Sequence, residues 1–199
     1  YFSNICKEIS KSRLTFTSRT KTGSAIMSKH RKTLPQSCLF PGGDFPFNVI
    51  TSVKGYETFG ESKNYHIHPF AVEIQYIRSG SGYYFIKNRK YPFKAGTLFI
   101  IHGDELHAFI RGEEGVLVKK TYMAFSYSFF AKYPEMKPVM DKISKCRAGF
   151  HHRLQLDGTS ATHVEFLADI LQGEWDHKGV FHKEAIVNAL SQLLIFIIR

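Results

Sequence analysis

Four residues between positions 66 and 107 carry side chains that bind metals and polar ligands, at spacings that can bring them together. His66 and His68 are separated by one residue, His68 and Glu73 by four residues, and Gly96 and His107 by ten residues. Imidazole nitrogens and carboxylate oxygens are ligands for zinc, iron(II) and manganese. Three histidines and one glutamate could fill four positions around one ion, so the sequence predicts a single His/Glu site.

This convergence requires two strands and a turn. Side chains two apart on a strand share a face, which aligns His66 with His68. Glu73 lies five positions after His68 and would face the other way on an unbroken strand. Pro69 supplies the break, since it fixes its own backbone and removes a ladder donor. We therefore expect a turn at Pro69–Ala71 and a second strand that points Glu73 back inward, with His107 on a later alternating strand.

The composition is that of a packed globular protein. Of the 199 residues, 43% are hydrophobic and 15% aromatic, which suffices for one core domain with an appendage. The three cysteines, Cys6, Cys38 and Cys146, have no paired spacing, so we expect neither disulfides nor a zinc knuckle and place the protein in a reducing cytoplasm. No apolar run approaches the roughly 18 residues that span a bilayer, so no membrane partner is expected.

Most of the net charge of +10 lies in the first residues. Residues 1–33 contain eight Lys/Arg and one acid, while the rest contains 19 Lys/Arg and 16 acids. Residues 1–37 are polar and basic, and we expect them to be disordered. Such a tail could contact phosphates or act as a targeting segment. It could equally lie upstream of the true start, since the first methionine is Met27.

The remaining chain divides into a strand-rich part, 38–125, and a helical part, 126–199. Alternation and turn signals predict strands at Phe45–Val53, Val72–Ile77, Gly82–Ile86, Thr97–Ile101, Leu106–Ile110 and Val116–Phe125. This spacing predicts a mainly β double-sheet jelly roll. Helical periodicity follows at Pro134–Cys146, 162–175 and 181–198, and the last two predict an antiparallel helix pair.

Two details of the helical part are specific. Thr162 and Glu165 have capping-box spacing, so we expect the first helix of the pair to begin there. The run Leu193–Ile198 is apolar on nearly all sides, which predicts burial against a partner chain or a further domain.

The two His/Glu blocks resemble the two cupin motifs. Gly60, His66, His68, Glu73 and Gly80 match the first motif, and Gly96 and His107 match the second. The chain departs from the second motif at His102-Gly103-Asp104, where cupins usually have Pro-x-Gly, and at Arg111, where many have Asn. The resemblance implies a cupin-like β-barrel.

A barrel followed by a helix pair also resembles the N-terminal half of AraC-type transcription regulators, from about Pro46 to Arg199. The matching segments are His66-x-His68-x4-Glu73, Tyr76-Ile77-x-Ser79-Gly80-x-Gly82, Tyr91-x4-Gly96-x-Leu98-Phe99-Ile100 and Asn188-Ala189-Leu190-x2-Leu193-Leu194. The resemblance implies a barrel that binds a small effector and helices that form a homodimer. The DNA-binding domain of that family, with its two helix-turn-helix units, is missing from this sequence.

Three functions stay open at this stage. The first is effector sensing, with a small polar metabolite, such as a sugar, bound by His66, His68, Glu73, His107 and Tyr76. The second is a small metal-dependent cupin oxygenase or isomerase, in which the three histidines and Glu73 hold zinc, iron, manganese or nickel. The third is a dimerisation module that titrates a full-length regulator.

Other polar and aromatic residues suggest less specific roles. We expect His102, Asp104 and Glu105 to lie in a solvated loop, and His151-His152 to lie on the surface. Trp175 is expected to pack at a helix end. Several tyrosines could stack on an effector, although aromatic side chains also fill small barrels: Tyr56, Tyr65, Tyr76, Tyr83 and Tyr84.

Overall fold

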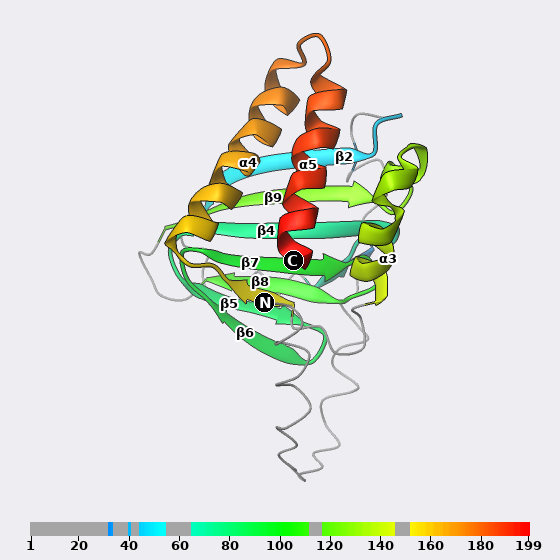
Figure 1. Cartoon of the computed structure of the whole chain (residues 1–199). Coiled ribbons are helices and arrows are strands. Elements are labelled where there is room, and N and C mark those ends of the chain that lie inside the picture. Colours follow the sequence, from blue (N-terminus) through cyan, green and yellow to red (C-terminus); the bar gives the residue numbers. More distant parts are fainter. Residues whose placement is uncertain (1–31, 34–39, 41–43, 55–64, 112–116, 146–151) are drawn as a thin grey trace.

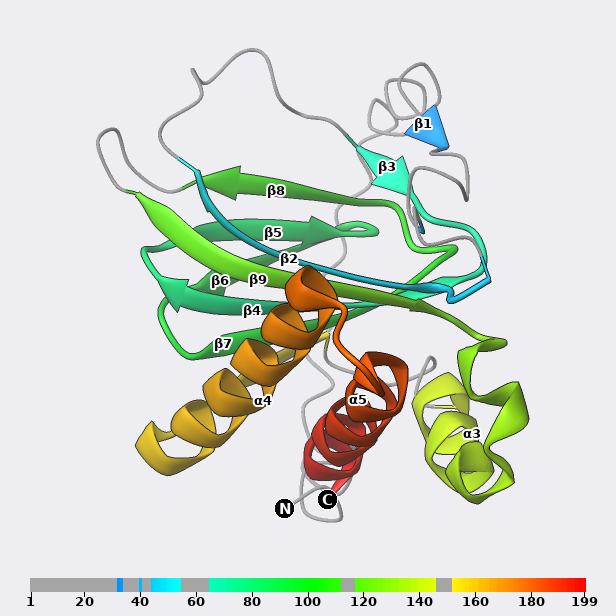
Figure 2. The ribbon, with the colours of Figure 1, turned by 90° about the horizontal axis from the view of Figure 1, so that it is seen from above.

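The computed structural model describes residues 32–33, 40, 44–54, 65–111, 117–145 and 152–199. These residues form two β-sheets and a layer of helices (Figures 1 and 2). Among them, no helix combines the length and the apolar composition that crossing a membrane requires. Gly60, Cys6, Cys38, Cys146, Tyr56 and His151 lie outside the described residues.

The fold is mainly β, as predicted. One sheet has the order β1-β3-β8-β5-β6 and the other β10-β7-β4-β9-β2; all pairs are antiparallel except β1–β3. The strands of the first sheet are β1 (Lys32–Thr33), β3 (His66–Ile67), β8 (His107–Arg111), β5 (Gly82–Ile86) and β6 (Arg89–Phe93). Those of the second are β10 (Arg153–Gln155), β7 (Thr97–His102), β4 (Ala71–Ser79), β9 (Val118–Ser126) and β2 (Phe47–Lys54).

The helices cover the outer face of the second sheet (Figure 2). They comprise two short 3-10 helices, η1 (Phe129–Lys132) and η2 (Pro134–Met136), then α3 (Lys137–Lys145), α4 (Gly158–His177) and α5 (His182–Ile198). The predicted C-terminal helix pair is thus present as α4 and α5. Trp175 packs edge-on against Phe47, their ring centroids 5.7 Å apart, as expected of a packing residue.

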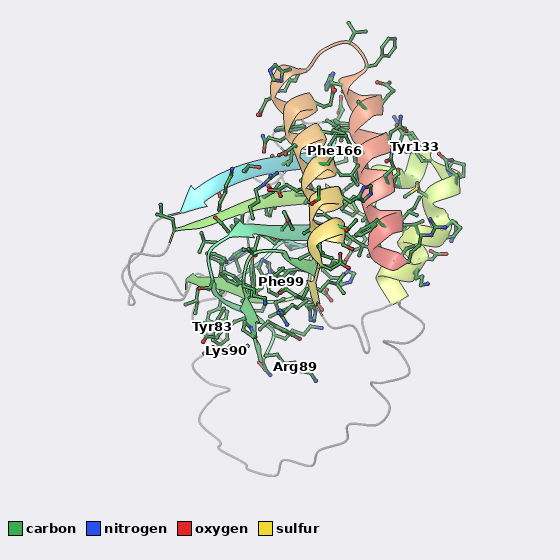
Figure 3. The ribbon with its side chains drawn as sticks, turned by 60° about the vertical axis from the view of Figure 1, so that its left-hand side comes forward. Tyr83, Arg89, Lys90, Phe99, Tyr133 and Phe166 are labelled. Atoms are coloured by element: carbon green, nitrogen blue, oxygen red, sulfur yellow. The ribbon has the colours of Figure 1, made fainter. Side chains whose placement is uncertain are left out.

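The second sheet is covered on both faces at β4, which explains why β4 is buried from Ala71 to Ile77 without alternation. Val72, Ile74 and Tyr76 join the core beneath the helices. Ile77 joins a second core between the sheets, where Phe99 also lies (Figure 3). Because sides alternate along a strand, Glu73 shares the inner face with Ile77. The space between the sheets is called the lumen below.

Two expectations about the helix pair were wrong. Helix α4 begins at Gly158, because the Asp157 side chain caps it by accepting a hydrogen bond from Ser160 N at 2.8 Å. Thr162 lies inside the helix instead and donates to Gly158 O. The apolar C-terminal run is largely covered by this chain itself, because Leu193, Leu194 and Ile197 are buried in the core between the helices and the second sheet.

Three short strands were not predicted. β6 contains Pro92, which disfavours a central strand but is tolerated here because β6 is a sheet edge. β10 is three residues long, too short to show a period. β1 lies within the segment expected to be disordered, but it pairs with β3, so the expectation of disorder was wrong at Lys32–Thr33. The other residues of 1–37 lie outside the described residues.

Candidate functional site

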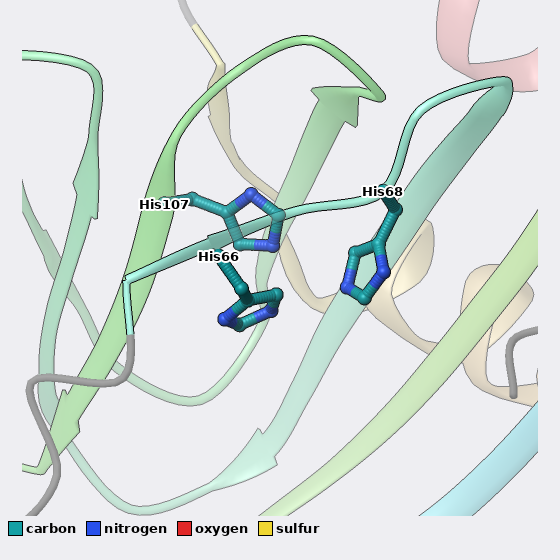
Figure 4. A group of neighbouring side chains, drawn as sticks. All are labelled: His66, His68 and His107. Carbon is teal, nitrogen blue, oxygen red and sulfur yellow. The ribbon is translucent and has the colours of Figure 1, made fainter. Parts of the chain in front are cut away.

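His66, His68 and His107 form a cluster at one end of the lumen (Figure 4). His66 pairs directly with His107 across strands β3 and β8, and their ring centroids are 4.3 Å apart. The His66 and His68 rings are 4.7 Å apart, as expected for side chains on one face. One nitrogen from each ring lies within 4.8 Å of the other two. The predicted convergence of the three histidines is therefore present.

The predicted turn after His68 brings Glu73 to the same place. Pro69 and Phe70 form the turn, Phe70 has a φ of 76°, and Ala71 N donates to His68 O at 3.2 Å. Gly103 lies against this turn, where a Cβ would collide with His68 O and with both Ala71 N and Ala71 O. Gly103 thus allows the β7–β8 loop to pack on the turn that carries His68.

Glu73 is buried and bridges two of the histidines. Its Oε1 lies 3.0 Å from His68 Nε2 and 3.5 Å from His107 Nε2, and its Oε2 accepts a hydrogen bond from Gln75 Nε2 at 3.1 Å. Burial alone would raise the pKa of Glu73, but the surrounding imidazoles, led by that of His107, outweigh it and hold the pKa at about 2. Glu73 is therefore ionised throughout the neutral range.

The two buried histidines respond differently to this carboxylate. Burial lowers the pKa of His68, although Glu73 partly opposes the shift. Burial also disfavours charged His107, but Glu73 outweighs it and the pKa of His107 is raised. His107 Nδ1 donates to the carbonyl oxygen of Glu105 at 2.7 Å, because a carbonyl can only accept. That bond leaves His107 Nε2 to face Glu73.

Glu105 belongs to a second buried polar group, contrary to the expectation of a solvated loop. Its Oε2 accepts from His102 N at 3.0 Å and lies 2.8 Å from His152 Nε2, while its Oε1 lies 2.8 Å from Lys87 Nζ. Burial raises its pKa, but hydrogen bonds from His152, Lys87 and His102 N lower it to about 2. These contacts stabilise the Glu105 carboxylate inside the fold, whereas the neighbouring Asp104 is exposed, as expected of a loop residue.

His152 and His102 were also placed wrongly by the sequence. His152 is buried, and its Nδ1 lies 3.2 Å from the Tyr91 hydroxyl while Nε2 contacts Glu105. His102 is buried beside the Tyr127 hydroxyl. The partners of His152 are Tyr91 of β6 and Glu105 of the β7–β8 loop, and the partner of His102 is Tyr127, just after β9. These contacts join segments that are distant in sequence, so residue spacing alone could not reveal them.

Tyr76 is not beside the histidine cluster. It lies three positions after Glu73 on β4, and this odd separation places it on the opposite face, where its hydroxyl donates to Ala161 O of α4 at 3.4 Å. Arg111 ends β8, but its side chain lies outside the described set. The motif glycines Gly80 and Gly96 have φ values of 87° and 77°, a conformation that favours glycine.

Further lumen residues come from strand β9. Tyr122 pairs with Gln75, and Lys120 pairs with Ile77, so both face the lumen. Tyr84 of β5 lies there too, its ring centroid 6.1 Å from that of His107. Burial, aided by Glu73, raises the pKa of both Tyr84 and Tyr122, so both phenols keep their protons. The alternation of β9 around apolar Met123 and Phe125 is the sequence signal that could have identified Tyr122 and Lys120.

The cluster has the donor set of a divalent metal site. Three imidazoles lie near one another, and Glu73 Oε1 contacts two of them. His107 presents Nε2 because Nδ1 is already bonded to a carbonyl, an orientation typical of metal-binding histidines. His66, His68, Glu73 and His107 therefore fit such an ion.

Comparison with known families identifies the architecture. Residues 57–194 match the AraC-like ligand binding domain. The chain belongs to this family. The match spans the histidine cluster, the lumen strand β9 and most of the helix pair, so the site and the helices are parts of one ligand-binding domain.

Solved structures offer more distant likenesses. The AraC-like transcriptional activator CuxR matches at 15% identity and a TM-score of 0.41, over 64% of this chain and 41% of CuxR. ToxT from Vibrio cholerae matches at 9% identity and a TM-score of 0.43, over 62% of this chain and 47% of ToxT. A cupin protein from Bacteroides fragilis matches at 20% identity and a TM-score of 0.30, over 40% and 62%. No curated protein sequence matches the chain.

Proposed function

We propose that this chain is the effector-sensing and dimerisation part of an AraC-type transcription regulator that works in the cytoplasm. Its two sheets form a cupin-like jelly roll, and a small polar metabolite, such as a sugar or a related compound, binds in the lumen beside His66, His68, Glu73 and His107. Binding alters the packing of the helices and so controls DNA binding by a helix-turn-helix domain outside this sequence.

The observation that carries this proposal is a set of buried polar atoms in the lumen of a ligand-binding domain. His68 Nδ1, the Tyr122 hydroxyl and Gln75 Oε1 are buried and have no hydrogen-bond partner among the described residues. A buried polar group without a partner costs about 1–3 kcal/mol. A polar effector would supply the missing partners, and each hydrogen bond so formed would favour binding.

Strand β9 gives the effector a route to the helices. Tyr122 faces the lumen, whereas its neighbour Thr121 faces α4 and its Oγ1 accepts a hydrogen bond from Arg78 Nε at 2.8 Å. The Arg78 guanidinium then contacts Glu165 at 2.9 Å and Asp169 at 2.6 Å, both on α4. A shift of Tyr122 on ligand binding would therefore move a residue that holds Arg78 in place.

A thermal-shift screen of small polar metabolites tests the proposal. A ligand present at about 100 times its Kd stabilises the folded protein by about 2.7 kcal/mol. For a domain of this size that is a rise in Tm of roughly 5–10 °C. The rise should be lost in Tyr122→Phe and His68→Ala but retained in Tyr83→Phe, which alters an exposed tyrosine. A screen with sugars, sugar acids and amino acids that gives no rise would count against effector binding.

A second candidate, a metal-dependent cupin enzyme, is favoured by the proximity of the three imidazoles. A zinc, iron, manganese or nickel ion held by His66, His68, Glu73 and His107 would supply Lewis-acid chemistry. This candidate predicts near-stoichiometric metal in the purified protein and its loss in His68→Ala, measured by elemental analysis. Metal-free protein that still gives the thermal shift would favour the sensor.

A further inference from the structure

Lys120 places a positive charge in the lumen at a distance from the histidine cluster. It pairs with Ile77 of β4, an inner-face residue, and therefore faces inward. Lys119 faces the opposite way and is exposed. The Lys120 ammonium lies 4.3 Å from the centroid of the Phe109 ring and 5.9 Å from that of Tyr84. Such cation–π contacts hold the charge beside the lumen wall.

A row of aromatic rings on the first sheet connects Lys120, which lies on the facing second sheet, with His107. The rings of Phe109 and Tyr84 are 5.7 Å apart, and Tyr84 in turn neighbours His107 at 6.1 Å. On strand β9, Lys120 lies four residues from Ala124, the cross-strand partner of Glu73. Four residues of strand correspond to about 13 Å, and the flexible lysine stem shortens the gap. A ligand that contacts both Lys120 and the histidine cluster would therefore have to span about this distance.

Tyr122 and Gln75 lie midway between these ends and offer complementary hydrogen bonds. Tyr122 carries a buried hydroxyl that can donate, and Gln75 a buried carbonyl oxygen that can only accept; neither atom has a partner among the described residues. Ile50, the partner of Tyr122 on β2, is 49% exposed, so solvent reaches the lumen face at this point. A ligand bound here could donate a hydrogen bond from a hydroxyl group to Gln75 Oε1 and accept one from the Tyr122 hydroxyl.

We infer that the effector is an anionic polyol: its negatively charged group pairs with Lys120 and Tyr122, and its hydroxyl groups bond Gln75 and the histidine cluster. This inference rests on the proposed function, because it names the class of molecule that the lumen binds. Lysine attracts carboxylates and phosphates alike. Glu73 lies at the far end of the lumen from Lys120, so the ligand's hydroxyl end, and not its charged group, faces Glu73.

Ligand-observed NMR with matched probes tests the charge requirement. Galacturonate is compared with galactose, gluconate with sorbitol, and galactose 1-phosphate is added to distinguish phosphate from carboxylate. The wild-type protein should bind the anionic member of at least one pair about tenfold more tightly than the neutral member. Lys120→Gln should remove that preference, Lys120→Arg should restore it, and the matched control Lys119→Gln should leave it unchanged.

The outcomes separate this inference from the proposed function. Tighter binding of the acids or the phosphate that depends on Lys120 supports it. Equal binding of neutral and anionic probes, an anion preference that survives in Lys120→Gln, or no binding by any anionic probe overturns it. A neutral sugar that binds and is lost in Tyr122→Phe would overturn the charge requirement while leaving effector sensing intact. The melting temperature of each variant, measured in parallel, shows whether it is folded.

Discussion

Glu105 joins three parts of the chain through one buried carboxylate, and its main-chain oxygen holds the ring of His107. In Glu105→Gln the shape is kept, but the charge that pairs with Lys87 and His152 is lost. Hydrogen bonds to charged groups contribute about 1.5–3 kcal/mol, so we expect a loss of this size in the free energy of unfolding at neutral pH, measured with urea. Glu135→Gln, an exposed control, should change it little.

The lowered pKa values of the buried carboxylates also predict how the stability of the protein changes with pH. Glu73 and Glu105 have pKa values of about 2 in the folded protein, against an ordinary 4.5. The unfolded chain therefore binds more protons between these values, so the stability that each carboxylate provides is complete above about pH 4.5 and is lost toward about pH 2. Below pH 6.5 the lowered pKa of His68 and the raised pKa of His107 act in opposite directions.

Glu105→Gln should consequently lose less stability than the wild type as the pH falls from about 5 to about 3. Urea unfolding at several pH values in this range measures the difference. Equal slopes for the two proteins would contradict the placement of Glu105 as a buried, ionised group.

Among the elements, the β7–β8 loop and the turn after His68 depend on their close packing at Gly103. Gly103→Ala would force apart the backbone at His68 and Ala71, because the added Cβ has no space. Overpacking of this kind costs about 1–3 kcal/mol, and it should also displace His68. Thermal unfolding and the histidine NMR signals would measure the two effects. Gly173→Ala, where nothing lies within 4 Å of the added Cβ, is the control.

Arg78 is the main polar tie between β4 and α4. Its side chain is only 6% exposed, although its partners Glu165 and Asp169 are 43% and 64% exposed. Arg78→Met should therefore destabilise the protein by only about 1–2 kcal/mol, since solvent weakens both ion pairs. Hydrogen exchange should nevertheless increase in α4, while the exposed control Arg89→Met leaves it unchanged. Unaltered exchange in α4 would mean that apolar packing alone holds the helix.

Elements with a clear hydrophobic periodicity were predictable from the sequence. Short elements, and those that form only by pairing with a distant strand, were not. Val72, Ile74 and Tyr76 alternate with inward-facing residues, which fixes β4, and the stripe through Leu190 and Leu193 fixes α5. In contrast, β10 exists because it pairs with β7, a contact between distant segments. The start of α4 was misplaced because two capping signals compete, and the Asp157 side chain is the one that caps.

The same distinction applies to the site. The convergence of His66, His68 and Glu73 follows from local spacing and one turn, whereas His107 joins them through the pairing of β3 with β8. The contacts of Glu105, His152 and Lys120 depend on which strands pair and in which register, and neither is encoded by local spacing. Sequence patterns therefore identified the candidate ligands but not the residues that orient them.

At the scale of the whole molecule, the exposed apolar side chains of the helix pair support the proposed homodimer. Phe166 of α4 is 61% exposed (Figure 3) and Ile195 of α5 is 37% exposed. Phe166→Asp should weaken dimerisation at least tenfold, because it would bury a charge in the interface. Sedimentation velocity measures this. Phe70→Asp, which changes a 68% exposed residue on the barrel, should not affect dimerisation. A wild-type protein that is monomeric at all concentrations would contradict this arrangement.

The proposed function requires that ligand binding in the barrel changes the packing of the helices. Hydrogen exchange tests this most directly, measured with and without the metabolite that gives the largest thermal shift. We expect protection to rise in β4, β8 and β9 around the lumen, and exchange to change in α4 as well, with the α4 response reduced in Arg78→Met. Protection confined to an exposed surface away from His66, His68 and His107, or a barrel response with no change in either α4 or α5, would contradict the account.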